Sequence, residues 1–318
     1  MRIIIDGQGP FGEKVLQALI QRGEEVVGVF SPPDKRGEPL KGLAEKSRIF
    51  FFRPKHMKDP EVQDHFMKLR PDLVVLAFVT DIFPEKLLNI PTIGTICYHP
   101  SLLPRHRGGS AINWAIIHGD IRTGITILWS DKGIDTGPIL LQKEVEIGPD
   151  DTTGSIYFNT LFPMGVDAIV EAVELIKKGK ALKIPQDESK ATYEPPCDDR
   201  VASVNFEKPI KDIYNLIRGC DPQPGAYTTY HPSPYPSPLR GEGKGEGKKV
   251  RFYEAKMSPS TIEKRPGEIV SIEEGSLQIA VKGGVIRVGK LRVDKGEKVG
   301  PIEFAKLVEV KIGEQFGE

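Results

Sequence analysis

The sequence predicts an α/β domain built on a mostly parallel sheet, followed by a small β-rich domain. In the first half of the chain, short apolar runs rich in β-branched residues alternate with helical patterns, which is typical of βαβ units. The last third instead carries short strand patterns separated by glycine-containing turns, which favours a small β domain. A chain of 318 residues is long enough for both domains.

Strands and helices are expected to alternate along the first half. The strands are predicted at residues 3–5, 25–30, 50–52, 73–78 and 92–97, and the helices near 11–22, 60–69, 84–89 and 110–118. A strand pair at 124–130 and 139–147 follows. The helical spacing of apolar residues then predicts a long helix over about 152–178, which Pro163 should kink or split.

A shift in composition at residues 193–199 marks the expected boundary between the two domains, residues 1–200 and residues 201–318. The second domain is expected to begin with a short helix at 210–218. Its strands are predicted at residues 250–254, 267–272, 277–282 and 285–291.

A low-complexity segment lies near residues 231–249. Its first half is rich in proline, which favours an extended chain, and its second half is rich in glycine, which favours a flexible coil. The segment could be a partner-binding tail. We instead expect a surface insertion in a hairpin, because the entropy of loop closure grows slowly with loop length, and we expect poor order there.

Composition argues against several classes of protein. Lysine plus arginine and aspartate plus glutamate both number 44, so the net charge is zero and no global field attracts nucleic acid or an anionic membrane. The cysteines, Cys97, Cys197 and Cys220, are widely spaced, which favours a reducing compartment and argues against a zinc knuckle. We find no signal-peptide pattern and no run of about 18 apolar residues, so we expect a cytoplasmic protein.

The loop of residues 7–12 formally matches a dinucleotide-binding fingerprint, since its glycines follow a strand and open a helix. That fingerprint also requires an acidic residue at the end of the second strand. Here the second strand ends without one, and Asp34 lies beyond two prolines. We therefore interpret the loop as a tight turn between a strand and a helix, and we expect no NAD.

The most informative motif is residues 98–109, Tyr-His-Pro-Ser-Leu-Leu-Pro-Arg-His-Arg-Gly-Gly. It continues an apolar strand, so His99 is predicted at a strand end, where a rigid scaffold holds a loop. Asp135 stands on another loop, between Gly133 and Gly137. A histidine and an aspartate with few other titratable groups nearby favour proton transfer at a carbonyl-like carbon.

This motif and the downstream Asp-Thr-Gly at residues 135–137 resemble the 10-formyltetrahydrofolate-dependent formyltransferases. The resemblance continues at residues 161–163, 191–194, 217–219 and 224–226. It is nearest to the amino-terminal hydrolase domain of 10-formyltetrahydrofolate dehydrogenase, and the chain is also similar to methionyl-tRNA formyltransferase. It implies a Rossmann-like formyltransferase domain that binds folate, and a C-terminal domain similar to an OB-type barrel.

The resemblance implies roles for His99, Asp135 and Cys97. The family histidine handles the proton and polarises the formyl oxygen, and the family carboxylate orients the histidine or the attacking water. Most members carry asparagine at the position of Cys97, although the hydrolase domain of the dehydrogenase has an aliphatic residue there. Because a thiol is a weak donor, Cys97 cannot stabilise an oxyanion in the usual way. It could be a nucleophile, but we favour a small core residue.

For the folate, the resemblance implies contacts from two loops and from the turn beside the formyl group, largely through backbone groups. Arg105 and Arg107 would meet an anionic acceptor or a glutamate tail, or else they are solvated charges at a helix entry. No metal site is expected, because the remaining histidines show no ligand spacing. The implied folate-binding residues are Thr80, Asp81, Phe83, Ser101, Leu102, Leu103, Pro104, Lys132, Gly133 and Ile134.

The predicted activity is removal or transfer of the formyl group of 10-formyltetrahydrofolate, the formyl-donor substrate, with release of tetrahydrofolate. Water is the favoured acceptor. Methionyl-tRNA is an alternative, but the loop of residues 34–41 is short and mildly basic, which disfavours tRNA because its binding depends on phosphate contacts. A non-catalytic folate-binding protein is a further alternative. No membrane partner is expected.

Overall fold

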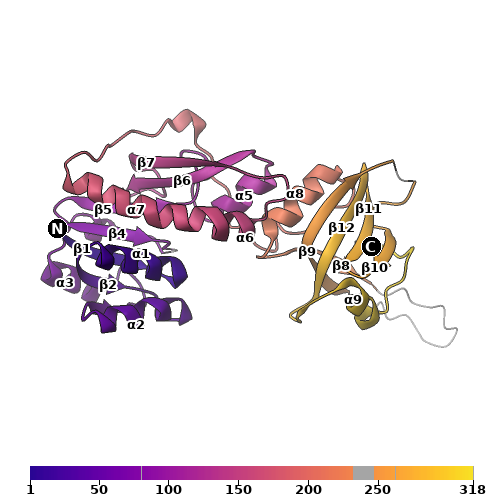
Figure 1. Cartoon of the computed structure of the whole chain (residues 1–318), viewed down its shortest axis with the longest axis horizontal. Helices are drawn as coiled ribbons and strands as arrows, with labels where there is room; N and C mark the ends of the chain where they lie inside the picture. Colours follow the sequence, from indigo (N-terminus) through magenta and orange to yellow (C-terminus); the bar gives the residue numbers. More distant parts are fainter. Residues whose placement is uncertain (80, 232–246, 262, 318) are drawn as a thin grey trace. The chain divides into compact units, whose positions relative to one another are not determined.

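The computed structural model describes residues 1–79, 81–231, 247–261 and 263–317. These residues form two compact units that are each discontinuous in sequence. Unit 1 comprises Met1–Ala111, Arg122–Glu146 and Tyr157–Pro195, and unit 2 comprises Ile112–Ile121, Ile147–Ile156 and Pro196–Glu318. Unit 2 therefore takes two short segments from the first half of the chain, which carry most of α5 (Ala111–Ile117) and all of α6 (Thr153–Ile156) (Figure 1).

Unit 1 is built on a mostly parallel sheet. Its described strands are β1 (Arg2–Gly7), β2 (Glu25–Phe30), β3 (Phe50–Phe52), β4 (Leu73–Ala77), β5 (Gly94–His99), β6 (Arg122–Trp129) and β7 (Ile139–Glu146). They lie in the order β3-β2-β1-β4-β5-β6-β7. The first five strands pair in parallel, whereas β6 is antiparallel to both β5 and β7. The predicted α/β class is confirmed.

The helices of unit 1 form because they bury one apolar face. They are α1 (Gly9–Gln21), α2 (Glu38–Lys46), α3 (Pro60–Leu69), α4 (Glu85–Leu88) and α7 (Phe162–Lys177). In α1, Phe11, Val15 and Leu19 are buried at helical spacing, and a proline occupies the first turn, where it is tolerated. Of these helices, α2 was missed by the sequence analysis.

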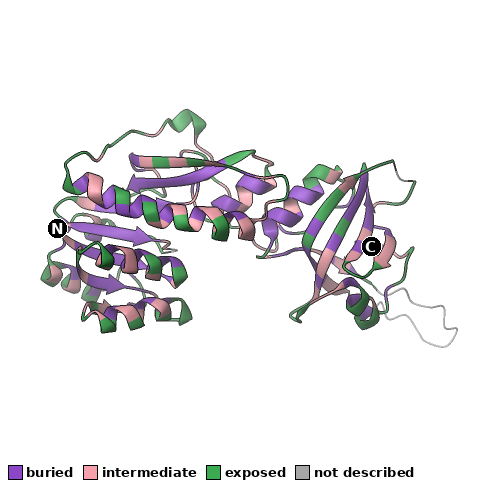
Figure 2. Cartoon of the chain, viewed as in Figure 1, coloured by how far each residue is buried: buried purple, intermediate pink, exposed green. Residues whose placement is uncertain are grey.

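The central strands of unit 1 are buried on both faces. Every residue of β4 is buried, as are those of β1 after Arg2, which is expected for parallel strands covered by helices. Figure 2 shows these strands in purple, next to helices with green, exposed faces. The carboxyl ends of β1, β4 and β5 meet at one edge of the sheet, which is where open α/β sheets bind their ligands.

The long helix expected over residues 152–178 is divided. A π-helical segment, Tyr157–Leu161, separates α6 from α7, and Pro163 lies in the first turn of α7. Among the described residues, the stretch Thr153–Lys177 is long and apolar enough to cross a membrane by length and composition alone. Within that stretch 44% of the most apolar part is buried, and α7 buries a full apolar face that includes Ile169, as a core helix does.

Unit 2 contains an antiparallel sheet. Its described strands are β8 (Ala226–Tyr230), β9 (Lys248–Pro259), β10 (Ile269–Glu273), β11 (Ser276–Val281), β12 (Gly284–Val293) and β13 (Lys298–Val299), joined by the helices α8 (Ile210–Cys220) and α9 (Pro301–Val308). The order is β10-β11-β12-β9-β8, and β13 pairs with β12. The prediction of a small β-rich C-terminal domain is confirmed, while its likeness to an OB-type barrel stays a prediction. The sequence analysis missed β8, β13 and α9.

Aromatic side chains dominate the core of unit 2. Phe252, Phe304 and Phe316 are each at most 1% exposed, and the rings of Phe252 and Phe316 meet edge to face with centroids 5.5 Å apart. Nearby, the Sγ atoms of Cys197 and Cys220 lie 3.7 Å apart without a disulfide bond. Apolar packing therefore holds this unit together.

The low-complexity segment connects two paired strands. Tyr230 at the end of β8 lies opposite Lys248 at the start of β9, so the segment interrupts a hairpin, as predicted. Residues 232–246, on which the expectation of poor order falls, lie outside the described residues. Lys248 and Lys249, which the sequence analysis placed in the insert, belong to β9.

Candidate active site

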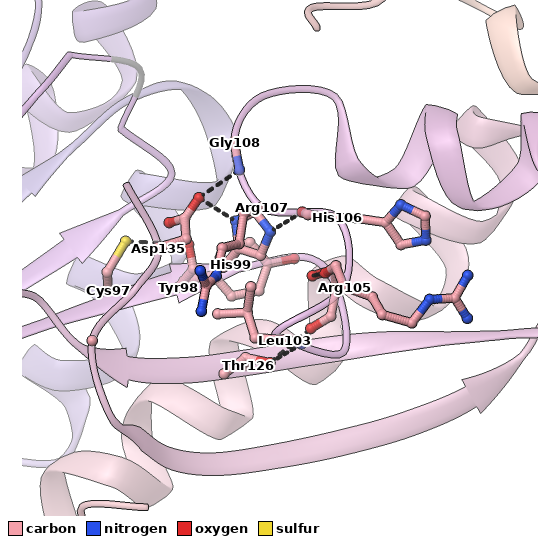
Figure 3. Close-up of polar contacts among 12 residues, drawn as sticks. Cys97, Tyr98, His99, Leu103, Arg105, His106, Arg107, Gly108, Thr126 and Asp135 are labelled. Carbon is pink, nitrogen blue, oxygen red and sulfur yellow. Dashed lines mark hydrogen bonds and ion pairs between the residues drawn. The ribbon is translucent and has the colours of Figure 1, made fainter. Parts of the chain in front are cut away.

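His99 and Asp135 meet at the carboxyl edge of the unit 1 sheet. His99 is the last residue of β5 and is 5% exposed. Asp135 lies in the loop between β6 and β7. The His99 Nδ1 atom is 3.4 Å from Asp135 Oδ2 (Figure 3). The fold therefore brings together His99 and Asp135, which are thirty-six positions apart in the sequence.

One hydrogen bond fixes the tautomer of His99. Its Nε2 atom lies 2.7 Å from the backbone carbonyl oxygen of His106. A carbonyl oxygen only accepts, so Nε2 must carry the hydrogen and donate it. In the neutral ring Nδ1 is then the acceptor, and in the imidazolium ion it donates toward Asp135. His99 Nδ1 and the Asp135 carboxylate are thus arranged to share one exchangeable proton.

The position of Asp135 is held from two sides. The backbone N–H of Gly108 donates to Asp135 Oδ2 over 2.8 Å, and Gln186 Nε2 donates to the Asp135 carbonyl oxygen over 2.7 Å. Asp135 itself has a φ of +54°, a left-handed conformation that costs energy in a non-glycine residue. Gly137 passes so close to the Trp129 carbonyl that a Cβ would clash with it. The loop is therefore strained and tightly constrained.

The turn after His99 is fixed by buried polar contacts. Ser101 Oγ donates to the Arg105 carbonyl oxygen, and Thr126 Oγ1 donates to the Ser101 carbonyl oxygen, both over 2.7 Å. Gln142 Nε2 donates to the Leu103 carbonyl oxygen over 2.8 Å. The side chains of Ser101 and Leu103 are buried. These two side chains therefore hold the loop rather than face an open surface.

Leu102 and Pro104 complete this turn and are both half-buried. The Thr192 backbone N–H donates to the Pro104 carbonyl oxygen over 3.2 Å. Leu102 packs beside Gly124 of β6, where a Cβ would meet its side chain. The turn is thus clamped between β6 and a segment that follows α7.

Arg107 connects the turn to that later segment. Its side chain is fully buried, and its guanidinium donates to Gln186, to both carboxylate oxygens of Glu188 and to the Tyr193 hydroxyl. The hydrogen bonds to Glu188 raise the pKa of Arg107 and lower the pKa of Glu188. Arg107 is therefore neither solvated nor open to an anionic ligand. Arg105, in contrast, has an exposed side chain.

Cys97 lies two residues before His99, partly buried against two apolar clusters, one that includes Leu76 of β4 and one that includes Leu128 of β6. Burial raises the pKa of its thiol well above the ordinary value, and the nearby charges of Asp135 and Asp6 raise it further. Only a thiolate is an effective nucleophile. The protonated thiol of Cys97 matches the core residue that we favoured, and it does not match a nucleophile.

The loops expected to bind folate are placed differently from one another. Lys132, Gly133 and Ile134 are exposed and lead directly into Asp135. Phe83 turns toward the core of unit 1, with its ring 5.9 Å from that of Phe66. Asp81 is exposed. Thr80 lies outside the described residues.

The carboxylate of Asp34, which the sequence offered as a ribose ligand for a dinucleotide, is bound within its own loop. It caps a short 3-10 turn, Lys35–Gly37, and accepts side-chain hydrogen bonds from both Nε and Nη2 of the Arg36 guanidinium. These bonds lower the pKa of Asp34. A carboxylate held in this way is a structural element of the β2–α2 connection.

Sequence reasoning missed the segment that supports the site. This segment is residues 186–194. Gln186 donates a hydrogen bond to the Asp135 carbonyl oxygen and accepts one from Arg107. Glu194 lies with its Oε1 atom 3.2 Å from Nδ1 of the buried His106. Thr192 also bonds the His106 backbone N–H. No local pattern reveals these hydrogen bonds, which join residues 51 to 86 positions apart. The resemblance did include residues 191–194, but it assigned them no role.

A model of the formyl transferase family matches residues 1–173, and a model of the formyl transferase C-terminal domain matches residues 198–308. The cytosolic 10-formyltetrahydrofolate dehydrogenase of Xenopus laevis is 46% identical over 235 residues, which cover 72% of this chain and 26% of that protein. The methionyl-tRNA formyltransferase of Geotalea daltonii is 33% identical over 325 residues, which cover 100% of this chain and 98% of that protein.

A solved structure shows the same fold. HypX from Aquifex aeolicus, in complex with tetrahydrofolic acid, superimposes with a TM-score of 0.69 at 20% identity, over 99% of this chain and 48% of that one. The chain thus spans about a quarter of the length of the dehydrogenase and about half of HypX. With family matches on both its amino-terminal and carboxy-terminal parts, the chain belongs to the formyl transferase family of enzymes.

Proposed function

We propose that this enzyme removes the formyl group from 10-formyltetrahydrofolate, releases tetrahydrofolate, and passes the formyl group to water. The observation that carries this proposal is the pairing of His99 with Asp135 in a single tautomer, at the carboxyl edge of the sheet. The formyl group on folate N10 is amide-like. Its removal therefore needs a base for the nucleophile, a donor for the oxyanion and an acid for the departing nitrogen.

The two residues can divide these tasks. As the oxygen of water bonds to the formyl carbon, the Asp135 carboxylate accepts a proton from that water. The His99 imidazolium donates its Nδ1 hydrogen, first as a hydrogen bond to the oxyanion and then as a proton to N10 when the C–N10 bond breaks. The products are formate, tetrahydrofolate and a proton. The proton on Asp135 returns to His99 across the 3.4 Å contact.

The proposal assigns no oxyanion contact to Cys97. Its thiol is a weak donor and its Sγ atom lies 3.5 Å from the Tyr98 carbonyl oxygen. One well-placed oxyanion donor is typically worth about 2.7–4 kcal/mol of barrier. In this site His99 therefore carries both the electrostatic and the proton-transfer contribution.

The relatives support the folate substrate. One is named for 10-formyltetrahydrofolate and another for methionyl-tRNA formylation, and HypX binds tetrahydrofolic acid. For the folate we retain Asp81, Phe83, Leu102, Pro104 and the loop of residues 132–134 as contacts, with Arg105 for an anionic tail. Cytoplasmic localisation, the absence of a metal or NAD requirement, and the division at residue 200 remain part of this proposal.

Methionyl-tRNA is the second candidate acceptor, because a relative of that name matches the chain along its whole length. The connection between β2 and α2 presents few free positive charges to a phosphate backbone, since Arg36 is bound to Asp34. The whole reaction of the dehydrogenase is not proposed here, because the chain spans 26% of that protein.

The test is release of tetrahydrofolate from 10-formyltetrahydrofolate, with and without charged initiator methionyl-tRNA. We expect release without tRNA, together with an equal amount of formate, and loss of both in His99→Asn. Release that requires tRNA, with formyl on the methionine, would show that tRNA is the acceptor. Binding of the folate without a His99-dependent reaction would instead show a carrier.

A further inference from the structure

Unit 1 contains a polar pocket that shares Asp81 with the folate contacts proposed above, and whose other wall residues have no role in the proposed reaction. It has a volume of about 260 Å³ and lies at the carboxyl ends of β1 and β2. Its wall includes Asp6 from β1, Gln8 from the following turn, Ser31 after β2, and Asp81 after β4. Pockets for drug-sized ligands measure roughly 300–1,000 Å³, so this one suits a small molecule.

Two groups in this wall lack partners among the described residues. Asp6 is 6% exposed and accepts no hydrogen bond from any described residue, and its remaining exposure faces the pocket. Gln8 is 5% exposed, and its Oε1 atom has no hydrogen-bond donor in the described part of the chain. Buried polar atoms are nearly always paired. Two unpaired acceptors in one pocket indicate that a ligand with hydrogen-bond donors completes it.

The charge around the pocket favours a cation. Burial, with the negative charge of Asp81 as a second cause, raises the pKa of Asp6 to about 7. Arg36 also lines the pocket; its guanidinium is hydrogen-bonded to Asp34, and its charge also interacts with that of Asp81, so Asp6 is the carboxylate in this wall without a described cation. The other basic groups in the wall, Lys55 and His56, have exposed side chains and no described ion pair with Asp6 or Asp81.

We propose that this pocket binds a small organic ammonium ion, with Asp6 and Asp81 as its counter-charges and Gln8 as a hydrogen-bond acceptor. An ammonium group carries three N–H donors and one positive charge, which match the unpaired oxygens. A metal ion fits less well, since Asp6 and Asp81 belong to no described cluster of three possible ligands close enough to share one.

The pocket lies beside the candidate active site. Cys97 is close enough to both carboxylates that Asp135 and Asp6 each raise the pKa of its thiol. β5, which ends at His99, pairs with β4, and β4 pairs with β1, which carries Asp6. A ligand bound at Asp6 would therefore lie at the end of a strand two positions from the strand that ends at His99. Its binding does not depend on formyl transfer, so binding can be tested without activity.

Three probes of similar size and different charge test this proposal. They are 2-aminoethanol, ethane-1,2-diol and glycolate, titrated at constant ionic strength while the backbone amide signals of Gly7, Gln8 and Ser31 are followed by NMR. We expect saturable shifts with 2-aminoethanol, and none with the diol or with glycolate. Binding should weaken at least about tenfold in Asp6→Asn and in Asp81→Asn, because each removes one counter-charge.

The matched control is Asp64→Asn, an exposed aspartate on α3 outside this pocket. It should bind 2-aminoethanol as the unaltered protein does. Equal shifts with the diol, unchanged binding in both pocket variants, or no shift at millimolar probe would each overturn the proposal. So would tighter binding of MgCl2, which would mean a metal site. Binding that emerges only in Lys55→Met would show that Lys55 is the cation of this pocket.

Asp81→Asn keeps the test decisive if Asp6→Asn alters folding, because Asp81 is exposed. If the unaltered protein releases tetrahydrofolate but binds no amine, this inference alone would be refuted. If the unaltered protein binds the amine but shows no His99-dependent release of tetrahydrofolate, the proposed function alone would be refuted.

Discussion

The two units use strained and buried polar residues differently. Among the described residues of unit 2, the non-glycine residues with positive φ are Glu254, Asp294 and Glu309, and all three are exposed. Unit 1 has exposed residues of this kind too, Arg48 and Arg70, but it also has His106, Ser110 and Asp135, which are buried or half-buried in and around the candidate site. Strain in an exposed turn is a local cost, whereas strain at a buried site persists only if surrounding contacts enforce it.

The cores show the same contrast. Unit 2 is filled by aromatic and aliphatic side chains such as Phe252 and Phe316. Unit 1 buries His99, Arg107 and Asp6 at the edge of its sheet. Unit 2 also buries charged side chains, but these are paired: Arg251 donates to Asp199, and Glu268 accepts from Lys264. The comparison indicates that unit 2 pairs these buried charges within its own fold, while unit 1 leaves Asp6 without a described donor and places a buried histidine at the candidate site. Changes in the two units should therefore affect different measurements.

The largest effect is expected for His99→Asn in unit 1. This change removes the group that donates to the oxyanion and to N10, so the rate of tetrahydrofolate release should fall about 10²–10⁴-fold. Thermal stability should change little. The measurement is steady-state kinetics beside a melting curve, with His65→Asn on α3 as the control, which should retain full activity. An equal loss of activity in His65→Asn would mean that the effect is not specific to His99.

Phe252→Ala in unit 2 should show the opposite pattern. Loss of a buried aromatic side chain typically costs about 3–5 kcal/mol of stability, and Phe252 is completely buried in an apolar core. We expect a lower midpoint in urea unfolding, with kcat per folded molecule unchanged. Met257→Ala on the exposed face of β9 is the control and should be nearly neutral. A tenfold fall in kcat without unfolding would contradict the separation of roles.

Asp6→Asn should increase stability at high pH. The pKa of Asp6 rises from 3.8 to about 7 on folding, so between these values the folded state holds a proton that the unfolded state has lost. Ionisation therefore destabilises the fold, and the free energy of unfolding falls as pH rises through this range. An asparagine cannot ionise. The variant should be more stable by roughly 1–4 kcal/mol at about pH 8, and little changed at about pH 4.

Chemical unfolding at the two pH values checks this expectation, with Asp64→Asn as the exposed control. Equal stability of Asp6→Asn and the unaltered protein at high pH would mean that the Asp6 carboxylate already has a counter-charge.

The smallest effect is expected for Cys97→Ala. The thiol is protonated and packed among apolar groups, so its loss removes one small contact and no reacting atom. We expect kcat/KM within about threefold of the unaltered protein, since changes away from a specific mechanism are worth about 0.5 kcal/mol. Cys197→Ala in unit 2 serves as its control. A fall in kcat/KM as large as that of His99→Asn would indicate that Cys97 acts as a nucleophile.

Local sequence patterns predicted much of unit 1. Strand runs such as β4 and β2 are apolar and bounded by turns, so their positions agree with the structure closely. α2 was missed because Pro39 and Gly42 interrupt a short helix with few apolar residues. In unit 2, β8 is a short strand that ends next to the low-complexity segment, and α9 has only eight residues.

The site was predictable only where it is local. His99 follows a strand and Asp135 sits between glycines, and both are visible in the sequence. The partners of Arg107 are not visible in the sequence. An arginine before two glycines is expected to be solvated, and only the folded chain places Gln186 and Glu188 against it. Asp6 was overlooked for a related reason. Inside an apolar strand run it is a single break in the pattern, and only the fold shows that it faces a pocket.

The interleaving of the units has a consequence for biosynthesis. Residues 112–121 and 147–156 belong to unit 2 but are translated between segments of unit 1. They emerge from the ribosome before Pro196–Glu318, the remainder of their unit, has been made. A gene fragment that stops at residue 195 would encode these segments without their partners, and one that starts at residue 196 would lack them. A single cut therefore cannot yield unit 2 intact, and it yields unit 1 only with two unpaired segments of unit 2 attached.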